Sequence, residues 1–513
     1  MARFPLASRF LLRVAFVCAV FAPVWVSAQM HRLPGAPEGV IESGVPLFEI
    51  RSSDSMGLDM PPTDLRLLPD GRLIAFARRQ FAIGDGVRWE VLNQAAGDPT
   101  TPANQVAIDN DGTIYVGTPT GLARVEFSED GKWRLHEIET WTENRPILRN
   151  VIQIGRRWFW HGDSGSLVSW QPGDAPRDLG PADAISHVFA LQDHYYASDN
   201  TAAQLWRITP DGAANELIPQ TGIGHTPLAS APFAPGRVLL GTNTQGLQIF
   251  DGVKMEPLRG DEILGAGARI VSLSHIGGGH FAAAVESRGI IFFDRQGRVL
   301  QVLDRASDQR LASARQLIAG PGGAVWALLN DGVLRTEFPS RFSQYESLYG
   351  AASASAHPHR YQGVLWLLND GTLRRAIYDR NGRLDRFEID TPPAFAFTFS
   401  THLGIPVVGS DNGSYYRSDG GWVLFAPELR EMRITDTQLP DGRWLWIANG
   451  KTGWIRRTEE GSLHYTSEEL PELDRAYGLQ PASNGWIWAE RGAGRIMRIR
   501  AVGEKNRNRI LRP

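Results

Sequence analysis

The sequence predicts an all-β protein assembled from about eleven copies of one four-stranded unit. Three observations lead to this prediction. The phrase VWALLNDGVLR at 325–335 returns as VLWLLNDGTLR at 364–374. Fainter copies recur about every 42 residues, a period typical of stacked repeat architectures. Within each copy, short runs of aromatic and β-branched residues are bounded by Gly, Asp and Asn, as strands joined by hairpin turns require.

The first 28 residues have the composition of an export signal. Basic residues precede or interrupt an apolar stretch at 10–26, and small residues at 26–28 suit cleavage near Ala28. We therefore expect a mature chain that is periplasmic or secreted. An uncleaved membrane anchor is the alternative, but Arg13 shortens the apolar run below the roughly 20 residues that span a bilayer.

Cysteine content and charge exclude several kinds of function. The chain has one cysteine, Cys18, and it lies inside the export signal. The mature chain therefore has no disulfide, thiolate metal site or cysteine nucleophile. Removing 1–28 takes away three arginines and leaves 50 basic against 56 acidic residues, about −6, which argues against a nucleic-acid partner. We predict no cofactor and no metal, since His357 and His359 lack an identifiable third ligand.

The repeat divides the mature chain into four parts. Residues 29–45 are predicted to be an N-terminal linker, 46–345 to hold units one to seven, 346–500 to hold units eight to eleven, and 501–513 to be a basic tail. The run PLFEIRS at 46–52 precedes the first complete unit and reads as a lone outer strand. In a closed ring, such a strand completes the final blade and ties the two ends of the ring together.

About 42 residues give room for four short strands with hairpin turns, the content of one β-propeller blade. A blade cannot bury both of its faces alone, so neighbouring blades stack around an axis and aromatic side chains fill the gaps between them. We assign Trp326, Trp366, Trp446 and Trp488 to this packing. Eleven units exceed the four to eight blades of one ordinary ring, so the sequence predicts two rings.

The clearest units also carry a family resemblance. DNDGTIYVGTPTGLARVEF at 109–127 and GRVLLGTNTQGLQIFDG at 236–252 resemble the two-component regulator propeller repeat, with its Asp-x-x-Gly turn, aromatic strand, Gly-Thr and Gly-Leu. GWIWAERGAGRIMRI at 485–499 more distantly resembles the propellers of streptogramin lyases. The first resemblance implies an extracytoplasmic sensor module. It carries over no catalysis, because nothing after residue 500 reads as a sandwich domain, a membrane span or a kinase.

Candidate ligand-binding residues lie in the loops that join the second and third strands of each unit, because these loops open on the same face of a propeller. The loops offer hydrogen-bond donors, acceptors and both charge signs, which suits a polar small molecule or an oligosaccharide. The competing interpretation is that the Asn, Asp and Gly residues are tight-turn formers. The candidates are His161, Asp163, Asp199, Asn243, Glu286, Arg288, Asp331, Asp370, Asp411, Lys451, Glu490 and Arg491.

The function predicted from these observations is an exported ligand-binding sensor module that acts through a membrane-bound signalling protein. No catalytic residue is assigned, because we find no phosphate-binding glycine loop, zinc-protease helix or serine elbow. Two alternatives stay open. The chain could be a secreted lyase or hydrolase acting on a carbohydrate or ester, or a truncated hybrid sensor that lacks its kinase half.

Overall fold

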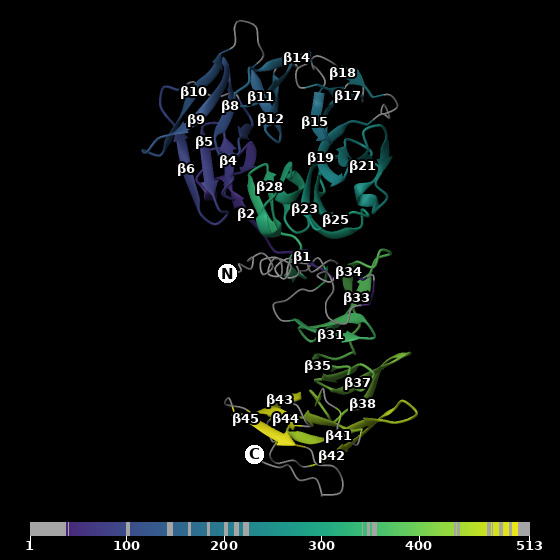
Figure 1. Ribbon diagram of the computed structural model, residues 1–513. Coiled ribbons are helices and arrows are strands. Elements are labelled where there is room, and N and C mark those ends of the chain that lie inside the picture. Colours follow the sequence, from purple (N-terminus) through teal and green to yellow (C-terminus); the bar gives the residue numbers. More distant parts are fainter. Residues whose placement is uncertain are drawn as a thin grey trace, which may run out of the picture.

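The computed structural model is almost entirely β and consists of a ring of seven blades followed by a second array of four (Figure 1). It describes residues 37–500, except 39, 99–102, 141–146, 163–165, 182–184, 200–203, 210–214, 219–224, 341, 346–348, 351–355, 436–437, 439–441, 469–472, 474–475, 482–485 and 492–494. Among the described residues, no helix is long and apolar enough to cross a membrane.

Each blade of the ring is an antiparallel sheet whose strands follow one another from the axis outward. Blades one to three comprise β3 (Asp64–Leu67), β4 (Leu73–Ala77), β5 (Gln80–Gly84), β6 (Trp89–Gln94), β7 (Val106–Ile108), β8 (Ile114–Thr118), β9 (Gly121–Phe127), β10 (Lys132–Thr140), β11 (Leu148–Ile154), β12 (Arg157–Gly162), β13 (Ser166–Trp170) and β14 (Arg177–Pro181). Blades four to six comprise β15 (Ile185–Leu191), β16 (His194–Asp199), β17 (Leu205–Ile208), β18 (Asn215–Leu217), β19 (Pro227–Ala234), β20 (Arg237–Thr242), β21 (Leu247–Phe250), β22 (Met255–Pro257), β23 (Ile270–Gly277), β24 (His280–Val285), β25 (Gly289–Asp294) and β26 (Val299–Asp304).

The seventh blade closes the ring with a strand from the other end of the sequence. Its sheet contains β27 (Gln316–Ala319), β28 (Ala324–Leu329), β29 (Gly332–Glu337) and, outermost, β2 (Phe48–Ser52). The antiparallel pairing of β2 with β29 confirms the predicted closing strand. Each innermost strand contacts the innermost strand of the next blade, and β27 contacts β3, so the cycle is complete.

Blades one and two are joined by backbone pairing between their outer strands. Their outer strands β6 and β10 pair in parallel, with Lys132 opposite Asn93 and Trp133 opposite Gln94, which merges both blades into one eight-stranded sheet. Trp133 is fully buried and packs edge-on against Phe81, with the ring centroids 5.0 Å apart. The periodicity of the sequence does not predict this seam, because it joins residues of two different units.

The second array consists of four blades that stack in sequence order below the ring (Figure 1). Its strands are β31 (Ala356–Tyr361), β32 (Val364–Asn369), β33 (Thr372–Tyr378), β34 (Leu384–Ile389), β35 (Ala396–Ser400), β36 (Val407–Ser410), β37 (Gly413–Ser418), β38 (Gly421–Ala426), β39 (Arg433–Ile434), β40 (Trp444–Ala448), β41 (Lys451–Arg457), β42 (Leu463–Ser467), β43 (Ala476–Pro481), β44 (Trp486–Arg491) and β45 (Arg495–Arg500). Within the described residues, the last blade has three strands, β43, β44 and β45.

The N-terminal segment connects the ring to the second array. β1 (Val45–Pro46) pairs with β30 (Ser343–Gln344), and Ile41 forms a parallel bridge with Arg383 in blade eight. Glu42 is buried beside them. Although the sequence analysis assigned 29–45 to a linker, the structure packs Ile41–Val45 against both parts of the molecule.

In the part of the chain that the structure describes, the helical elements are short and lie between strands. They are α2 (Ser53–Met56), η1 (Glu262–Leu264), η2 (Gln309–Ser313) and η3 (Pro321–Gly323). Ser52 caps α2 through its hydroxyl, and Gly57 ends it in the left-handed conformation, so the chain turns from β2 toward blade one within five residues.

Three of the four predicted inter-blade tryptophans are buried between blades. Trp326 packs against blade one, Trp366 against blade nine, and Trp446 against blade nine from the other side. Trp488 differs: 43% of it is exposed on the last blade of the array. Its neighbour Ala489 is fully buried, so the strand turns its small residue inward and its tryptophan outward.

Candidate functional site

The structure divides the predicted ligand-binding residues between the ring and the second array. Several lie within strands and not in the expected loops. His161 is in β12, Asp199 is the last residue of β16, and Glu490 and Arg491 are the last two of β44. Asp163 lies outside the described residues. Asn243, Glu286, Arg288 and Asp331 occupy ring loops between second and third strands, and Asp370, Asp411 and Lys451 occupy or adjoin the corresponding turns of the second array.

Four of the predicted residues in the ring have partners within the chain, and one of them, Asp331, accepts the hydroxyl of Ser53 at 3.2 Å. The Asn243 side-chain oxygen accepts the backbone N–H of Thr226 at 2.9 Å. Glu286 forms an ion pair with Arg269 at 3.3 Å, and the Arg288 guanidinium donates to the carbonyl of Ile263 at 3.4 Å. The Asn243 contact lies at the approach to blade five and those of Glu286 and Arg288 at the approach to blade six, so part of each side chain's hydrogen-bonding capacity is already used.

His161 lies in a desolvated environment near a second histidine, His187 of β15. Burial lowers the pKa of both imidazoles to about 4, and for His187 the proximity of His161 adds to the effect. His187 shares a hydrogen bond of 2.9 Å with the hydroxyl of Ser230 in β19. Both imidazoles are therefore neutral at pH 7, and the pair links blades three, four and five.

Two predicted carboxylates of the second array lie in turns that both hydrogen-bond to the connection between blades eight and nine. Asp370 is in the turn between β32 and β33, and Asp411 is in the turn between β36 and β37. The Asp411 carboxylate accepts the backbone N–H of Phe395 at 3.1 Å, and the N–H of Ala396 donates to the carbonyl of Gly371. The connection between blades eight and nine thus runs between the two acids.

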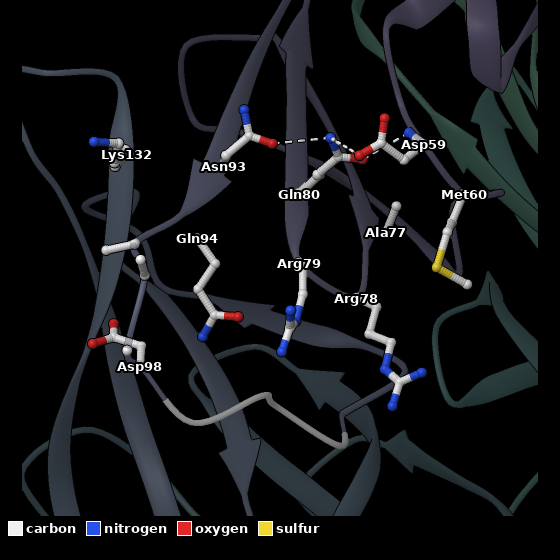
Figure 2. A pocket seen from close by; sticks show the side chains of 13 residues that line it. Asp59, Met60, Ala77, Arg78, Arg79, Gln80, Asn93, Gln94, Asp98 and Lys132 are labelled. Atoms are coloured by element: carbon white, nitrogen blue, oxygen red, sulfur yellow. Dashed lines mark hydrogen bonds between the residues drawn. The ribbon is translucent and has the colours of Figure 1, made fainter.

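A cavity of about 690 Å³ lies at the edge of blade one, on the face where the loops between second and third strands open (Figure 2). Four segments line it: the approach to β3, the turn between β4 and β5, the end of β6 with the residues after it, and the start of β10. The parallel pairing of β6 with β10 places the start of β10 beside the end of β6. The lining residues are Asp59, Met60, Ala77, Arg78, Arg79, Gln80, Asn93, Gln94, Ala95, Ala96, Gly97, Asp98 and Lys132.

One wall of the cavity is a fixed hydrogen-bond network. The Gln80 amide accepts the backbone N–H of Asp59 at 2.8 Å and donates to the Asp59 carboxylate at 3.1 Å and to the Asn93 side-chain oxygen at 2.9 Å. Gln80 is buried, so its orientation is held before any ligand binds. Figure 2 shows Arg78, Arg79 and Gln94 pointing away from this wall toward the other side of the cavity.

The cavity is lined by charged side chains of both signs, with Arg78, Arg79 and Lys132 cationic and Asp59 and Asp98 anionic. Asp98 accepts the backbone N–H of Leu135 at 3.0 Å, and Asp59 is held by Gln80, so both carboxylates are partly satisfied by neutral donors. Lys132 is paired with Asp130 at 3.0 Å. Arg78 and Arg79 are exposed at the two-residue turn between the paired residues Ala77 and Gln80.

The sequence analysis missed these two arginines because unit one matches the repeat poorly. The sequence did contain a signal: Ala-Arg-Arg-Gln separates two apolar strands where other units have polar loop residues. Arg78 adopts a positive φ of 50°, a conformation that Asn449 and Gly450 provide in the corresponding turn of blade ten. The turn geometry therefore does not account for the arginines.

The architecture of the chain is similar to that of solved structures. The chain superimposes with a TM-score of 0.63 and 13% identity on the extracellular domain ascribed to a hybrid two-component system, BT3049, of B. thetaiotaomicron, covering 91% of this chain and 66% of that one. The chain shares its β-propeller fold. It spans slightly less than two thirds of that neighbour's length.

Other neighbours superimpose less closely. They include the extracellular domain ascribed to the hybrid two-component system BT4673 of B. thetaiotaomicron (TM-score 0.45, 13% identity, 91% of this chain and 67% of that one) and a streptogramin B lyase (TM-score 0.43, 10% identity, 56% and 96%). The β-propeller fold shared with the first neighbour agrees with the fold implied by the repeat motifs. No protein-family model matches the sequence, and no curated protein matches it.

The described residues contain no group of three His, Cys, Asp or Glu side chains arranged to hold a metal ion. His357 and His359, considered above as ligands, lie in β31, where His359 packs edge-on against Phe399 at 5.0 Å. Asp109, the first residue of the predicted Asp-x-x-Gly turn, accepts the N–H groups of Asp111 and Thr113 and so forms a turn.

Proposed function

We propose that the chain is an extracytoplasmic recognition module that binds a polar, acid-bearing ligand in the cavity at Arg78 and Arg79. The observation that carries this proposal is the cavity itself. It combines two exposed guanidinium groups with a pre-oriented amide wall. Arginine recognises carboxylate and sulfate groups through paired N–H donors, and amides supply directional bonds to hydroxyls. An acidic oligosaccharide has both kinds of group.

The proposal includes export to the periplasm or the cell surface and an output through a membrane-bound signalling protein. The shared fold with an extracellular domain of a two-component system supports this part. The second array would then contact the partner, while the ring binds the ligand.

The test is a thermal-shift titration of the full chain with trigalacturonate, compared with the neutral trisaccharide maltotriose. Binding to the native state raises the melting temperature by mass action. We expect trigalacturonate to raise it, and Arg79→Gln to weaken the binding about tenfold, since one charge-assisted bidentate contact contributes roughly 1.5–3 kcal/mol.

Arg156→Gln is the matched control, because Arg156 is an exposed arginine in the turn between β11 and β12, on the opposite face of the ring. Equal effects of both substitutions, or no shift with trigalacturonate, would contradict binding in the cavity. Chromatographic analysis of the ligand afterward separates recognition from turnover, since an enzyme would consume it.

A further inference from the structure

Two aromatic side chains are exposed side by side on the second array. Phe395 is 49% exposed and Phe397 42% exposed, and their ring centroids lie 5.0 Å apart at an angle of 54°. Large apolar side chains that are exposed singly need no explanation, but adjacent ones often mark a contact surface. These two rings lie between the turns that carry Asp370 and Asp411.

The position of the Phe395 ring is determined by its surroundings. A methyl group built on Gly371 would lie 2.3 Å from the ring, so the ring rests directly on the glycine of the β32–β33 turn. The backbone of Phe395 is held from the other side, because its N–H donates to the Asp411 carboxylate and its carbonyl accepts the N–H of Asp411. The exposed ring is therefore fixed before a ligand arrives, which lowers the entropic cost of binding.

A β-bulge orients the second ring. The register between β35 and β36 shifts between Ala396 and Thr398, which leaves Phe397 as the extra residue. The same register shift occurs at the start of β11, β15 and β43, and at the start of β19 and β23, where the extra residues are Leu228 and Val271. Both of these aliphatic side chains are half-buried. The bulge can thus hold an aliphatic residue, and it does not account for an exposed aromatic ring.

The turns on either side of the rings each carry a carboxylate, which is a hydrogen-bond acceptor. Asp370 and Asp411 are exposed, and neither has an ion-pair partner within the described part of the chain. An aromatic face carries partial negative charge and attracts the C–H groups of a sugar ring, while carboxylates accept its hydroxyl protons. The two carboxylates also disfavour an anionic ligand.

We propose that Phe395, Phe397, Asp370 and Asp411 form a binding site for a neutral oligosaccharide. The site extends the proposed recognition role to the second array and uses residues separate from the cavity of blade one. The two sites differ in chemistry: guanidinium groups and amides in the ring, aromatic faces and carboxylates in the array.

The test is isothermal titration calorimetry of the full chain with cellohexaose, xylohexaose and maltohexaose. We expect at least one of these probes to bind, and Phe395→Ala and Phe397→Ala each to weaken that binding about tenfold or more, as for aromatic residues at the centre of other contact surfaces. Because both rings are exposed, the melting temperature of each variant should stay within a few degrees of the wild type.

Phe342→Ala is the control, since Phe342 is 69% exposed and lies outside the second array. Arg79→Gln should leave the binding of neutral probes unchanged, which separates failure of this site from failure of the cavity. The absence of binding by all three probes at millimolar concentration would overturn the proposal, and so would equal losses in Phe342→Ala. A dimer in sedimentation that Phe395→Ala dissociates would also overturn it, in favour of a protein interface.

Discussion

Glu42 and Arg360 form a two-pronged ion pair at the junction between the ring and the second array. The guanidinium donates to both carboxylate oxygens, at 3.0 and 2.5 Å, and the Glu42 side chain has no exposed surface. The hydroxyl of Tyr378 also donates to Glu42, and that of Tyr345 donates to the Glu42 carbonyl. Burial, with the bond to Glu42 second, raises the pKa of Tyr378 to about 12.

Glu42→Gln should therefore destabilise the junction by about 3–5 kcal/mol, because it leaves Arg360 with no opposing charge in a largely buried position. Differential scanning calorimetry measures this loss. Arg360→Met combined with Glu42→Gln should recover part of it, since removing both charges costs less than stranding one. Unchanged melting of the single variant would show that the junction does not depend on the pair.

A second prediction compares two tryptophans of the same repeat. Trp326 is 6% exposed between blades seven and one, whereas Trp488 is 43% exposed. Trp326→Ala should cost about 3–5 kcal/mol through the cavity that it leaves where the ring closes. Trp488→Ala should cost less than about 1 kcal/mol. Urea unfolding followed by circular dichroism measures both, and similar losses would mean that Trp488 is buried in solution by an interaction beyond this chain.

The repeated phrase shows how far the sequence could predict the packing. Leu329 pairs with Gly332 in one copy, whereas Asn369 pairs with Thr372 in the other, so the hairpin register differs by one residue. A one-residue shift turns every side chain to the opposite face. Trp326 is the second residue of its copy of the phrase, and Trp366 is the third residue of its copy. This difference of one position offsets the difference of one residue in hairpin register. Both tryptophans therefore face the following blade.

The repeat in the sequence predicted the blades and the closing strand. It did not predict the cavity of blade one or the aromatic pair of the second array. Strand number and inter-blade packing follow from local periodicity. The cavity instead depends on the parallel pairing of β6 with β10, and the aromatic pair depends on a bulge and on a glycine 24 residues before Phe395. The strand pairing and the glycine contact join residues of different units, so the period does not predict them.

A third prediction concerns Asp64, which connects three blades. Its buried carboxylate accepts the N–H of Val106 in blade two at 2.8 Å, the amide of Gln316 in blade seven at 2.9 Å, and the guanidinium of Arg66 at 2.8 Å. Asp64→Ala should cost about 3–5 kcal/mol, because three donors lose their acceptor away from water. Asp70→Ala is the matched control: its pair with Arg72 is exposed, and its loss should change the stability little. Calorimetry of both variants decides whether Asp64 is required for ring closure.

The last prediction is an acid sensitivity that comes from His161 and His187. Both have a folded-state pKa of about 4, whereas an imidazole in the unfolded chain titrates near 6.5. Between these values the unfolded state binds more protons, so stability should fall as the pH is lowered from about 6.5 toward 4 and stay constant above that window. Each imidazole contributes a slope that approaches about 1.4 kcal/mol per pH unit. Carboxylates contribute mainly at lower pH, because their unfolded pKa values are near 4.

Urea midpoints from pH 7 to pH 4.5 measure the slope of stability against pH. His187→Asn should reduce this slope, whatever the effect of the substitution on stability at pH 7. An identical slope in that variant would mean that His187 takes up its proton as readily in the folded chain as in the unfolded one.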